Sequence, residues 1–558
     1  MRRFLYIALL LVAAPMIASA QVAKQVEVEK DYIPSVNKAQ KLAMVPDMTD
    51  TVMMRPDIDY SFMPRSYETS LLTENFKPAT ISYWDFVRKR LLYVKAAAGV
   101  PLASEADVYV STYNKDRGYA MAYLNHEGDY QNRWALDGVT KVTDNTSEMS
   151  NRLGGRAGLN VGRHLLEVDI YGDQQMRHRY PTTGELIRFG EVQGALRFGD
   201  DFVDLSRWNF SVEVDGGFYY NRACSASGEK FNQSQFSVKA AVGRMLGQHQ
   251  LKIHAGYMGV YGGGALEAYK NNILMAGARY GVSGNRFNFL IGADYYHDRV
   301  GESGNSPHHI FPYVRMMWNN SKQSFVPYVE VDGELKQHNF GALSYENPFV
   351  LASQSVVDDG AVFSLANETL YNGRAGISGN LGKGIFSYNL SAQFTIADNH
   401  LYWYNVGADY LFTTAYQHSF TANGNIVFRP AGWFEATLDV SAYIWDNYDD
   451  YYSSRPNFEL DLGLRYTGRR LTVGANLGYM GGIKWMTLAE VLGEGGFPSF
   501  EATKTDSTFT LGLDAEWRIN DNWAVFAEGR NLTGSKVYEW LHYYRDSAQG
   551  IVGVKFNF

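Results

Sequence analysis

Residues 458–467 read Phe-Glu-Leu-Asp-Leu-Gly-Leu-Arg-Tyr-Thr, so an apolar or aromatic side chain occupies every second position. The positions between them hold charged residues, glycine or threonine. Successive side chains of a β-strand point to opposite faces of its sheet. The stretch therefore predicts a strand with one apolar face and one polar face.

The same alternation returns in residues 251–261, 287–295, 434–444 and 509–517. Strands of about 10 residues with one apolar face are typical of transmembrane β-barrels. A soluble β-sandwich also alternates, but many aromatic residues of this chain lie near strand ends, where a membrane barrel carries its aromatic girdles. We therefore predict an all-β fold, a transmembrane antiparallel up-and-down β-barrel.

The composition supports this fold class. The chain has 558 residues, of which 46% are hydrophobic and 15% aromatic, and its net charge is -8. Beyond the N-terminus no stretch approaches the roughly 18 to 20 apolar residues of a membrane-spanning helix, which excludes a helical bundle. The aromatic content excludes a disordered chain. The acidic balance gives no sign of a nucleic-acid partner.

The N-terminus has the features of a secretory signal peptide. Arg2 and Arg3 precede an apolar run over residues 4–14, and Ala18-Ser19-Ala20 provides a cleavage site. We assign residues 1–20 to the signal peptide, so the mature chain is expected to begin at Gln21. The single cysteine, Cys224, cannot form a disulfide within the chain.

Residues 21–90 differ from the rest of the chain. They contain five of its 15 prolines, which neither a long helix nor a central strand tolerates. We predict an extended leader that precedes a barrel spanning residues 91–558. A barrel of about 22 strands cannot fill its interior with its own wall side chains. We therefore expect the leader to occupy the lumen or its periplasmic mouth.

The connections between predicted strands alternate between short and long. The short ones are at residues 163–164, 284–285, 319–322, 429–432, 467–470 and 520–522. The long ones are at residues 128–151, 177–187, 220–233, 299–308, 336–367, 446–456, 482–505 and 531–549. Treating His400 to Thr413 as part of one more loop, at residues 398–415, gives about 22 strands. Short turns then face the periplasm together with both termini, and long loops face outward.

The last strand carries a second signal. Val554, Phe556 and Phe558 face one way and alternate with polar or small residues, so the chain ends on an outward aromatic residue. This ending looks like the signal that barrel-assembly machinery recognises during biogenesis.

Residues 511–558 resemble the end of the barrel in TonB-dependent receptors. The most specific part is Gly529-Arg530-Asn531-Leu532-Thr533-Gly534, followed by Tyr538. Residues 93–99 and 125–128 look like the opening strands of such proteins in the Bacteroidota. The resemblance implies a 22-stranded outer-membrane barrel that takes part in binding or uptake of a bulky ligand. The 70-residue leader is shorter than the globular plug of that family.

The leader also holds a loose match to the short box through which such receptors engage TonB. The match is Asp50-Thr51-Val52-Met53-Met54. A strand-like piece of leader that lies on the barrel is the alternative reading.

Three predicted outer loops carry groups of aromatic residues, which offer flat faces to a ligand or a protein partner. These candidates are Tyr402, Trp403, Tyr404, Tyr451, Tyr452, Tyr538, Trp540, Tyr543 and Tyr544. Girdle residues at the membrane interface are the alternative interpretation.

Two polar clusters offer side chains that could bind a metal ion, but neither has a diagnostic ligand spacing. They are His297, Asp298, Glu302, His308 and His309, and Asp446, Asn447, Asp449 and Asp450. We predict no metal, no cofactor and no catalytic residues, because the chain has no hydrolase motif.

Two functions stay open at this point. One is a receptor or transporter whose release step TonB energises. The other is a structural subunit that serves as a docking platform for surface lipoproteins or an envelope assembly. In both, the outer-membrane lipids surround the barrel.

Overall fold

The computed structural model describes residues 91–558, apart from residues 115–116, 137, 139, 143–144, 182–184, 203–204, 223–229, 268, 285, 301–307, 319–322, 352–364, 447–453 and 492–497. The predicted signal peptide, the leader and the TonB-box candidate lie outside the described residues. Cys224, Tyr451 and Tyr452 lie outside them as well.

The first half of the described chain contains thirteen strands. They are β1 (Leu92–Val100), β2 (Ala103–Asn114), β3 (Gly118–Asp129), β4 (Glu148–Val161), β5 (His164–Arg179), β6 (Glu185–Gly199), β7 (Asn209–Asn221), β8 (Phe231–Leu246), β9 (His249–Gly264), β10 (Lys270–Ser283), β11 (Phe287–Val300), β12 (His308–Trp318) and β13 (Val326–Lys336).

The second half adds two short helices and the remaining strands. They are α2 (Phe340–Glu346), β14 (Glu368–Leu381), η2 (Gly382–Gly384), β15 (Phe386–Val406), β16 (Asp409–Ala431), β17 (Phe434–Asp446), β18 (Phe458–Thr467), β19 (Leu471–Met480), β20 (Lys484–Val491), β21 (Pro498–Lys504), β22 (Thr508–Arg518), β23 (Trp523–Arg530), β24 (Val537–Trp540), β25 (Tyr543–Arg545) and β26 (Gln549–Asn557). No helix among the described residues has the length and apolar character needed to cross a membrane.

The strands close into a ring. The main sheet has 24 strands, but β19 pairs directly with β22, so β20 and β21 form a hairpin outside the ring and 22 strands remain. Each neighbouring pair in the ring is antiparallel, and β1 pairs with β26 from Tyr93↔Asn557 to Val100↔Gly550. The predicted all-β barrel of about 22 strands is confirmed.

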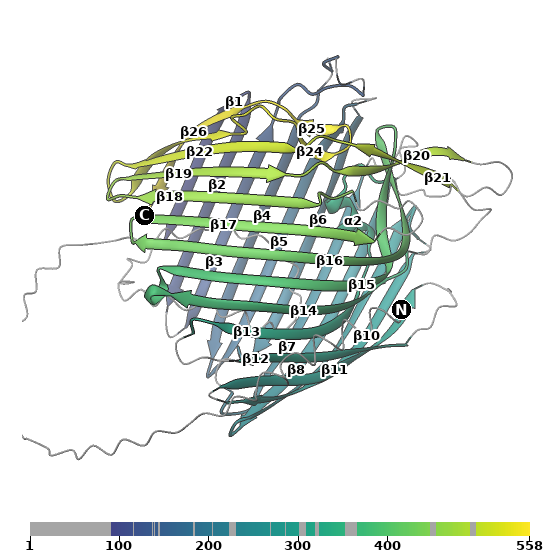
Figure 1. Cartoon of the computed structure of the whole chain (residues 1–558), viewed down its shortest axis with the longest axis vertical. Coiled ribbons are helices and arrows are strands. Elements are labelled where there is room, and N and C mark those ends of the chain that lie inside the picture. The colour runs from purple at the N-terminus through teal and green to yellow at the C-terminus, as the bar shows by residue number, and fades with distance from the viewer. Residues whose placement is uncertain are drawn as a thin grey trace, which may run out of the picture. The chain divides into compact units, whose positions relative to one another are not determined.

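The two ends of the barrel differ. The connections β4–β5, β18–β19 and β22–β23 are tight turns at one end, which we call the short-turn end. The connections β3–β4, β13–β14 and β23–β26 are long and lie at the other, the long-loop end. The N–H of Leu91 donates to the carbonyl of Phe558 over 2.6 Å, so the described chain begins and ends at the short-turn end. Figure 1 marks the C-terminus there.

The two faces of the wall differ in the way the alternation predicts. Outward side chains such as Leu153, Ile310 and Val552 are more than 60% exposed, which suits a hydrocarbon surrounding. Inward side chains form ion pairs, for example Arg152 with Asp173 over 3.1 Å and Lys95 with Glu105 over 2.7 Å. Val554 alternates with inward Lys555, as the sequence of the last strand predicts.

The segment from His400 to Thr413 is not an irregular loop. β15 and β16 continue through it as one long hairpin, with a register shift between Ala397 and His400. This hairpin belongs to a single connection between two barrel strands, so the predicted strand number is unaffected. β20 pairs in parallel with its β15 arm at Tyr404 and Asn405.

The two faces should respond differently to a charge. Val192 is outward and 55% exposed, so Val192→Lys should cost roughly 2 to 4 kcal/mol of barrel stability in a bilayer. Gln193→Lys is the matched control, because Gln193 is inward and a lysine there should cost less than about 1 kcal/mol. Urea unfolding in lipid vesicles measures both; equal losses would contradict the assigned faces.

Candidate functional site

A hydrophobic cluster fills the interior of the long-loop end. We call it the mouth cluster. Its buried members are Tyr180, Ile187, Phe189, Tyr219, Phe231, Val260, Leu266, Tyr269, Phe340, Leu343, Phe349, Val350, Leu365, Trp403, Tyr410, Phe412, Ile483, Trp485, Trp540, Leu541 and Tyr543.

The mouth cluster crosses the barrel from wall to wall. Phe231 begins β8, and Met480, which packs against the cluster, ends β19. In a ring of 22 strands these two strands lie opposite each other. A buried cluster that includes side chains from both walls must span the opening between them. The loops at this end therefore fold inward over the opening, and we expect them to close it.

Helix α2 is anchored to the inner wall. Its N-cap residue Asn339 accepts a hydrogen bond from the N–H of Ala342 over 2.8 Å, as an N-cap does. Gln233 of β8 donates to Asn339 over 3.1 Å, and Tyr345 donates to Asp173 of β5 over 2.8 Å. The helix thus lies against the β5–β8 side of the lumen (Figure 1).

The structure brings two of the three predicted aromatic groups together. Trp403 lies 5.6 Å from Trp540 between ring centroids, and Tyr543 stacks on Phe349 at 3.4 Å. Tyr402 and Tyr404 belong to a second buried cluster with Leu411 and Met486. Tyr538 and Tyr544 pack at 5.2 Å in the β24–β25 hairpin. Contact of these residues with a ligand stays a prediction, and it requires the loops to move.

Ion pairs fasten the β24–β25 hairpin to the wall. Arg545 pairs with Glu148 at 3.0 Å, and Arg177 pairs with Glu148 at 2.6 Å and with Glu539 at 3.4 Å. Arg133 lies 3.9 Å from Glu148 as well. We call these five residues the rim network. Glu148 is its centre and is only 9% exposed at its side chain.

A second polar group holds the start of the α2 loop. The backbone carbonyl of His338 accepts hydrogen bonds from Tyr269 at 2.5 Å and Asn271 at 3.1 Å. Its imidazole is buried, and its Nε2 lies 3.8 Å from Glu368. Burial lowers the pKa of His338 to about 4, against the smaller raising effect of the Glu368 carboxylate.

Closure of the mouth should therefore weaken in acid. In the unfolded loop His338 takes up a proton near pH 6.5, but in the packed loop it does so only near pH 4. The packed loop therefore has its full stability above pH 6.5 and loses stability as the pH falls from 6.5 toward 4. Between pH 7 and pH 5 the loss should be about 2 kcal/mol.

Hydrogen exchange of residues 338–347, corrected for intrinsic rates, measures this effect. His338→Gln keeps the backbone hydrogen bonds and lacks the titrating ring, so its protection should not change over the same range. An equal acid response of both proteins would show that another group titrates.

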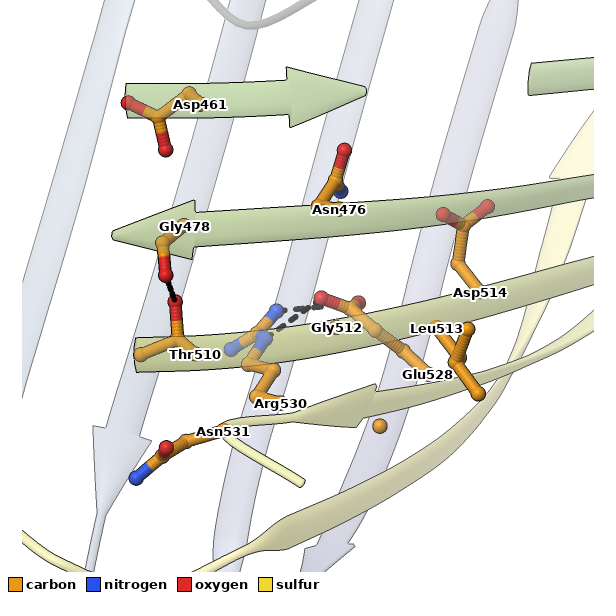
Figure 2. A pocket seen from close by; sticks show the side chains of 11 residues that line it. Asp461, Asn476, Gly478, Thr510, Gly512, Leu513, Asp514, Glu528, Arg530 and Asn531 are labelled. Carbon is orange, nitrogen blue, oxygen red and sulfur yellow. Dashed lines mark hydrogen bonds and ion pairs between the residues drawn. The ribbon is translucent and has the colours of Figure 1, made fainter. Parts of the chain in front are cut away.

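The inner wall near the β22–β23 strands contains a recess. Figure 2 shows Asp461, Asn476, Thr510 and Asp514 around it, together with Arg530, which pairs with Glu528 at 2.6 Å. Gly478 and Gly512 provide the space for the recess, because they carry no side chain into it. Asp461, Asn476 and Asp514 point inward by the alternation of their strands, so the recess faces the lumen.

The histidine-rich candidate cluster is divided between two faces. His297 and His308 are direct partners and lie 5.0 Å apart between ring centroids. Asp298 and His309 occupy the alternate positions, and Asp298 accepts from Asn367 inside the barrel. Glu302 lies outside the described residues, as do Asn447, Asp449 and Asp450. The backbone of Asp446 is the strand partner of His418. The described residues contain no group of three or more ligands that could hold a metal ion.

Sequence reasoning missed helix α2, the rim network and the recess. Asn339 followed by Phe340 and Leu343 is a signal for a capped short helix. The rim network gives no such signal, because Glu148 and Arg545 lie far apart in the sequence and meet only when the ring closes.

The fold is that of the 22-stranded barrels found in outer-membrane receptors and transporters. No protein-family model and no curated protein sequence matches the chain. Solved structures with a similar fold include the FrpB iron transporter from Neisseria meningitidis (F3-3 variant), at 12% identity and TM-score 0.64 over 85% of this chain and 82% of that one.

Two further structures are comparably similar. The siderophore receptor PirA from Acinetobacter baumannii has 12% identity and TM-score 0.62, over 84% of this chain and 80% of that one. The copper transporter OprC has 12% identity and TM-score 0.60, with the same coverage of 84% and 80%. At such identities the likeness shows the fold, which agrees with the receptor-like barrel that the sequence predicted.

Proposed function

We propose that the protein is an outer-membrane barrel that takes part in the uptake of a bulky ligand. The observation that carries this proposal is the mouth cluster, since a wide barrel closed at one end by its own loops suits a conduit that opens for a particular ligand. The similar barrels of an iron transporter, a siderophore receptor and a copper transporter support it. Engagement of TonB through residues 50–54 is part of the same proposal.

A docking platform is the second candidate, and the β20–β21 hairpin favours it. In the described residues β21 pairs only with β20, so its other edge has no strand partner. The hairpin extends past the rim of the barrel (Figure 1). Edges of this kind accept an added strand from another protein.

Purification from outer membranes in mild detergent separates the two functions. A receptor should be isolated alone or with a bound small molecule. A platform should co-purify with stoichiometric lipoprotein or barrel partners, identified by mass spectrometry. Stoichiometric partners that are lost on deletion of residues 484–504 would favour the platform and count against uptake.

The proposed topology places the long loops outside the cell and both termini in the periplasm. Cysteine labelling on intact cells, in a Cys224→Ser background, tests it. A membrane-impermeant maleimide should label Ser355→Cys, in a long loop, and spare Ser321→Cys, in a short turn. The reverse pattern would show that the barrel is inserted the other way.

A further inference from the structure

Five exposed basic residues lie together on the outward face of the long-loop end. Arg188 is in β6, Arg222 directly follows β7, Lys230 directly precedes β8, Lys270 begins β10 and Arg299 is in β11. We call them the basic rim patch.

The alternation of the strands fixes the face on which these residues lie. Arg188 stands between Ile187 and Phe189, which are 0% and 1% exposed in the mouth cluster. Lys270 stands between Tyr269 and Asn271, which face the lumen side. Their basic neighbours therefore point away from the lumen.

Hydrogen bonds continue the ladder to the residues at the strand ends. The N–H of Arg222 donates to the carbonyl of Arg188 over 2.9 Å. Phe231 is the direct partner of Asn221, so Lys230 and Arg222 are the next pair outward along the same two strands. Arg188, Arg222 and Lys230 thus form a row across three adjacent strands, which are about 4.8 Å apart.

Among the described residues of these strands, no carboxylate balances this row. By alternation, no Asp or Glu occupies an outward position in the described residues of β6 to β12. The five basic residues take part in no ion pair within the described part of the chain, and Arg222 instead lies over the ring of Tyr220 at 5.7 Å. Three neighbouring cations repel one another, so an anion from outside the chain would stabilise them.

The surface directly below the patch is apolar. Val192, Phe218, Phe236 and Leu274 lie on the same strands and are 45–55% exposed. Tyr295, outward and 40% exposed, donates to or accepts from His308 over 2.7 Å. Cations just above an apolar and aromatic band lie at the depth of lipid headgroups.

We propose that the basic rim patch binds the phosphorylated headgroups of lipids in the adjacent membrane leaflet. Arginine donates two parallel hydrogen bonds to a phosphate, and lysine adds a point charge. This proposal rests on the membrane placement given above and is independent of uptake. Under this proposal, phosphorylated lipids are the preferred neighbours of strands β6 to β11.

Native mass spectrometry of the purified full chain tests the proposal. The barrel is titrated in nonionic detergent with diphosphorylated lipid A and with lipid A stripped of its phosphates. The phosphorylated lipid should bind at least 10-fold more tightly, a comparison that needs no variant. Equal binding of the two lipids would overturn the proposal. Displacement by inorganic phosphate at equal concentration would show a free-anion site and overturn it too.

A triple variant locates the site. Arg188→Gln/Arg222→Gln/Lys230→Gln should weaken binding of the phosphorylated lipid about 100-fold, since each cation near an anionic headgroup contributes to affinity. The matched control, Arg244→Gln/Arg286→Gln/Arg469→Gln, removes the same charge near the short-turn end and should bind normally. Equal loss in both would place the lipid elsewhere.

Heat-modifiable migration on gels checks that each variant is folded. Absence of the protein from outer-membrane fractions would contradict the membrane placement. Failure of the proposed uptake function alone would not affect the conclusion about lipid binding.

Discussion

Deleting residues 340–366 together with residues 22–85 should turn the barrel into an open channel. The first deletion removes α2 and the cluster members Phe349, Val350 and Leu365 from the mouth. The second removes the leader proposed to fill the lumen. A 22-stranded barrel is wider than the 16- to 18-stranded porins that hold an aqueous channel, so large, stable conductance steps are expected in planar bilayers.

Deleting each segment alone shows which of the two closes the barrel. From sequence alone, loss of residues 22–85 behind the intact signal is expected to open the channel and sensitise cells to bulky antibiotics. With the mouth cluster intact, we now expect that deletion alone to leave conductance low. High conductance after the leader deletion alone would mean that the loops do not seal the mouth.

Replacing Glu148 by alanine should release the β24–β25 hairpin. Glu148 lies within 3.0 Å of both Arg177 and Arg545. Its loss leaves Arg177 with only the longer contact to Glu539 at 3.4 Å and Arg545 with Asp129 at 3.9 Å. Breaking a buried pair costs about 3 to 5 kcal/mol, and the loss here should lie toward the lower end because these contacts remain. Arg545→Ala should cost less than about 1 kcal/mol, because Arg545 is 48% exposed and Glu148 keeps Arg177.

Hydrogen exchange of residues 537–545 measures this difference. Glu435→Ala is the matched control, since its exposed pair with Arg429 lies near the short-turn end. If Arg545→Ala loosens the hairpin as much as Glu148→Ala, the rim network does not depend on Glu148.

The barrel could be predicted because the alternation that encodes each strand is local in the sequence. An apolar residue at every second position, as in residues 458–467, fixes which side chains face outward without any knowledge of the neighbouring strands. The strand number followed from the alternation of short and long connections. The prediction for His400 to Thr413 has the right topology and the wrong local structure, because a long hairpin and a loop share the same aromatic composition.

The closed mouth could not be predicted from the sequence. Trp403 and Trp540 were both singled out as aromatic loop residues, but their contact depends on two loops that fold inward from different parts of the ring. Glu148 and Arg545 meet for the same reason. Such contacts follow from closure of the whole sheet, and no local pattern encodes them.

The accessibility of a lumenal cysteine tests the central claim, that the chain's own loops close the long-loop end of the barrel. Asp461→Cys in a Cys224→Ser background places a thiol in the recess on the inner wall (Figure 2). On intact cells a bulky, impermeant maleimide should not label this thiol, but should label it after deletion of residues 340–366 and should label the control Lys504→Cys in both. Rapid labelling of Asp461→Cys with the loops intact would contradict the account.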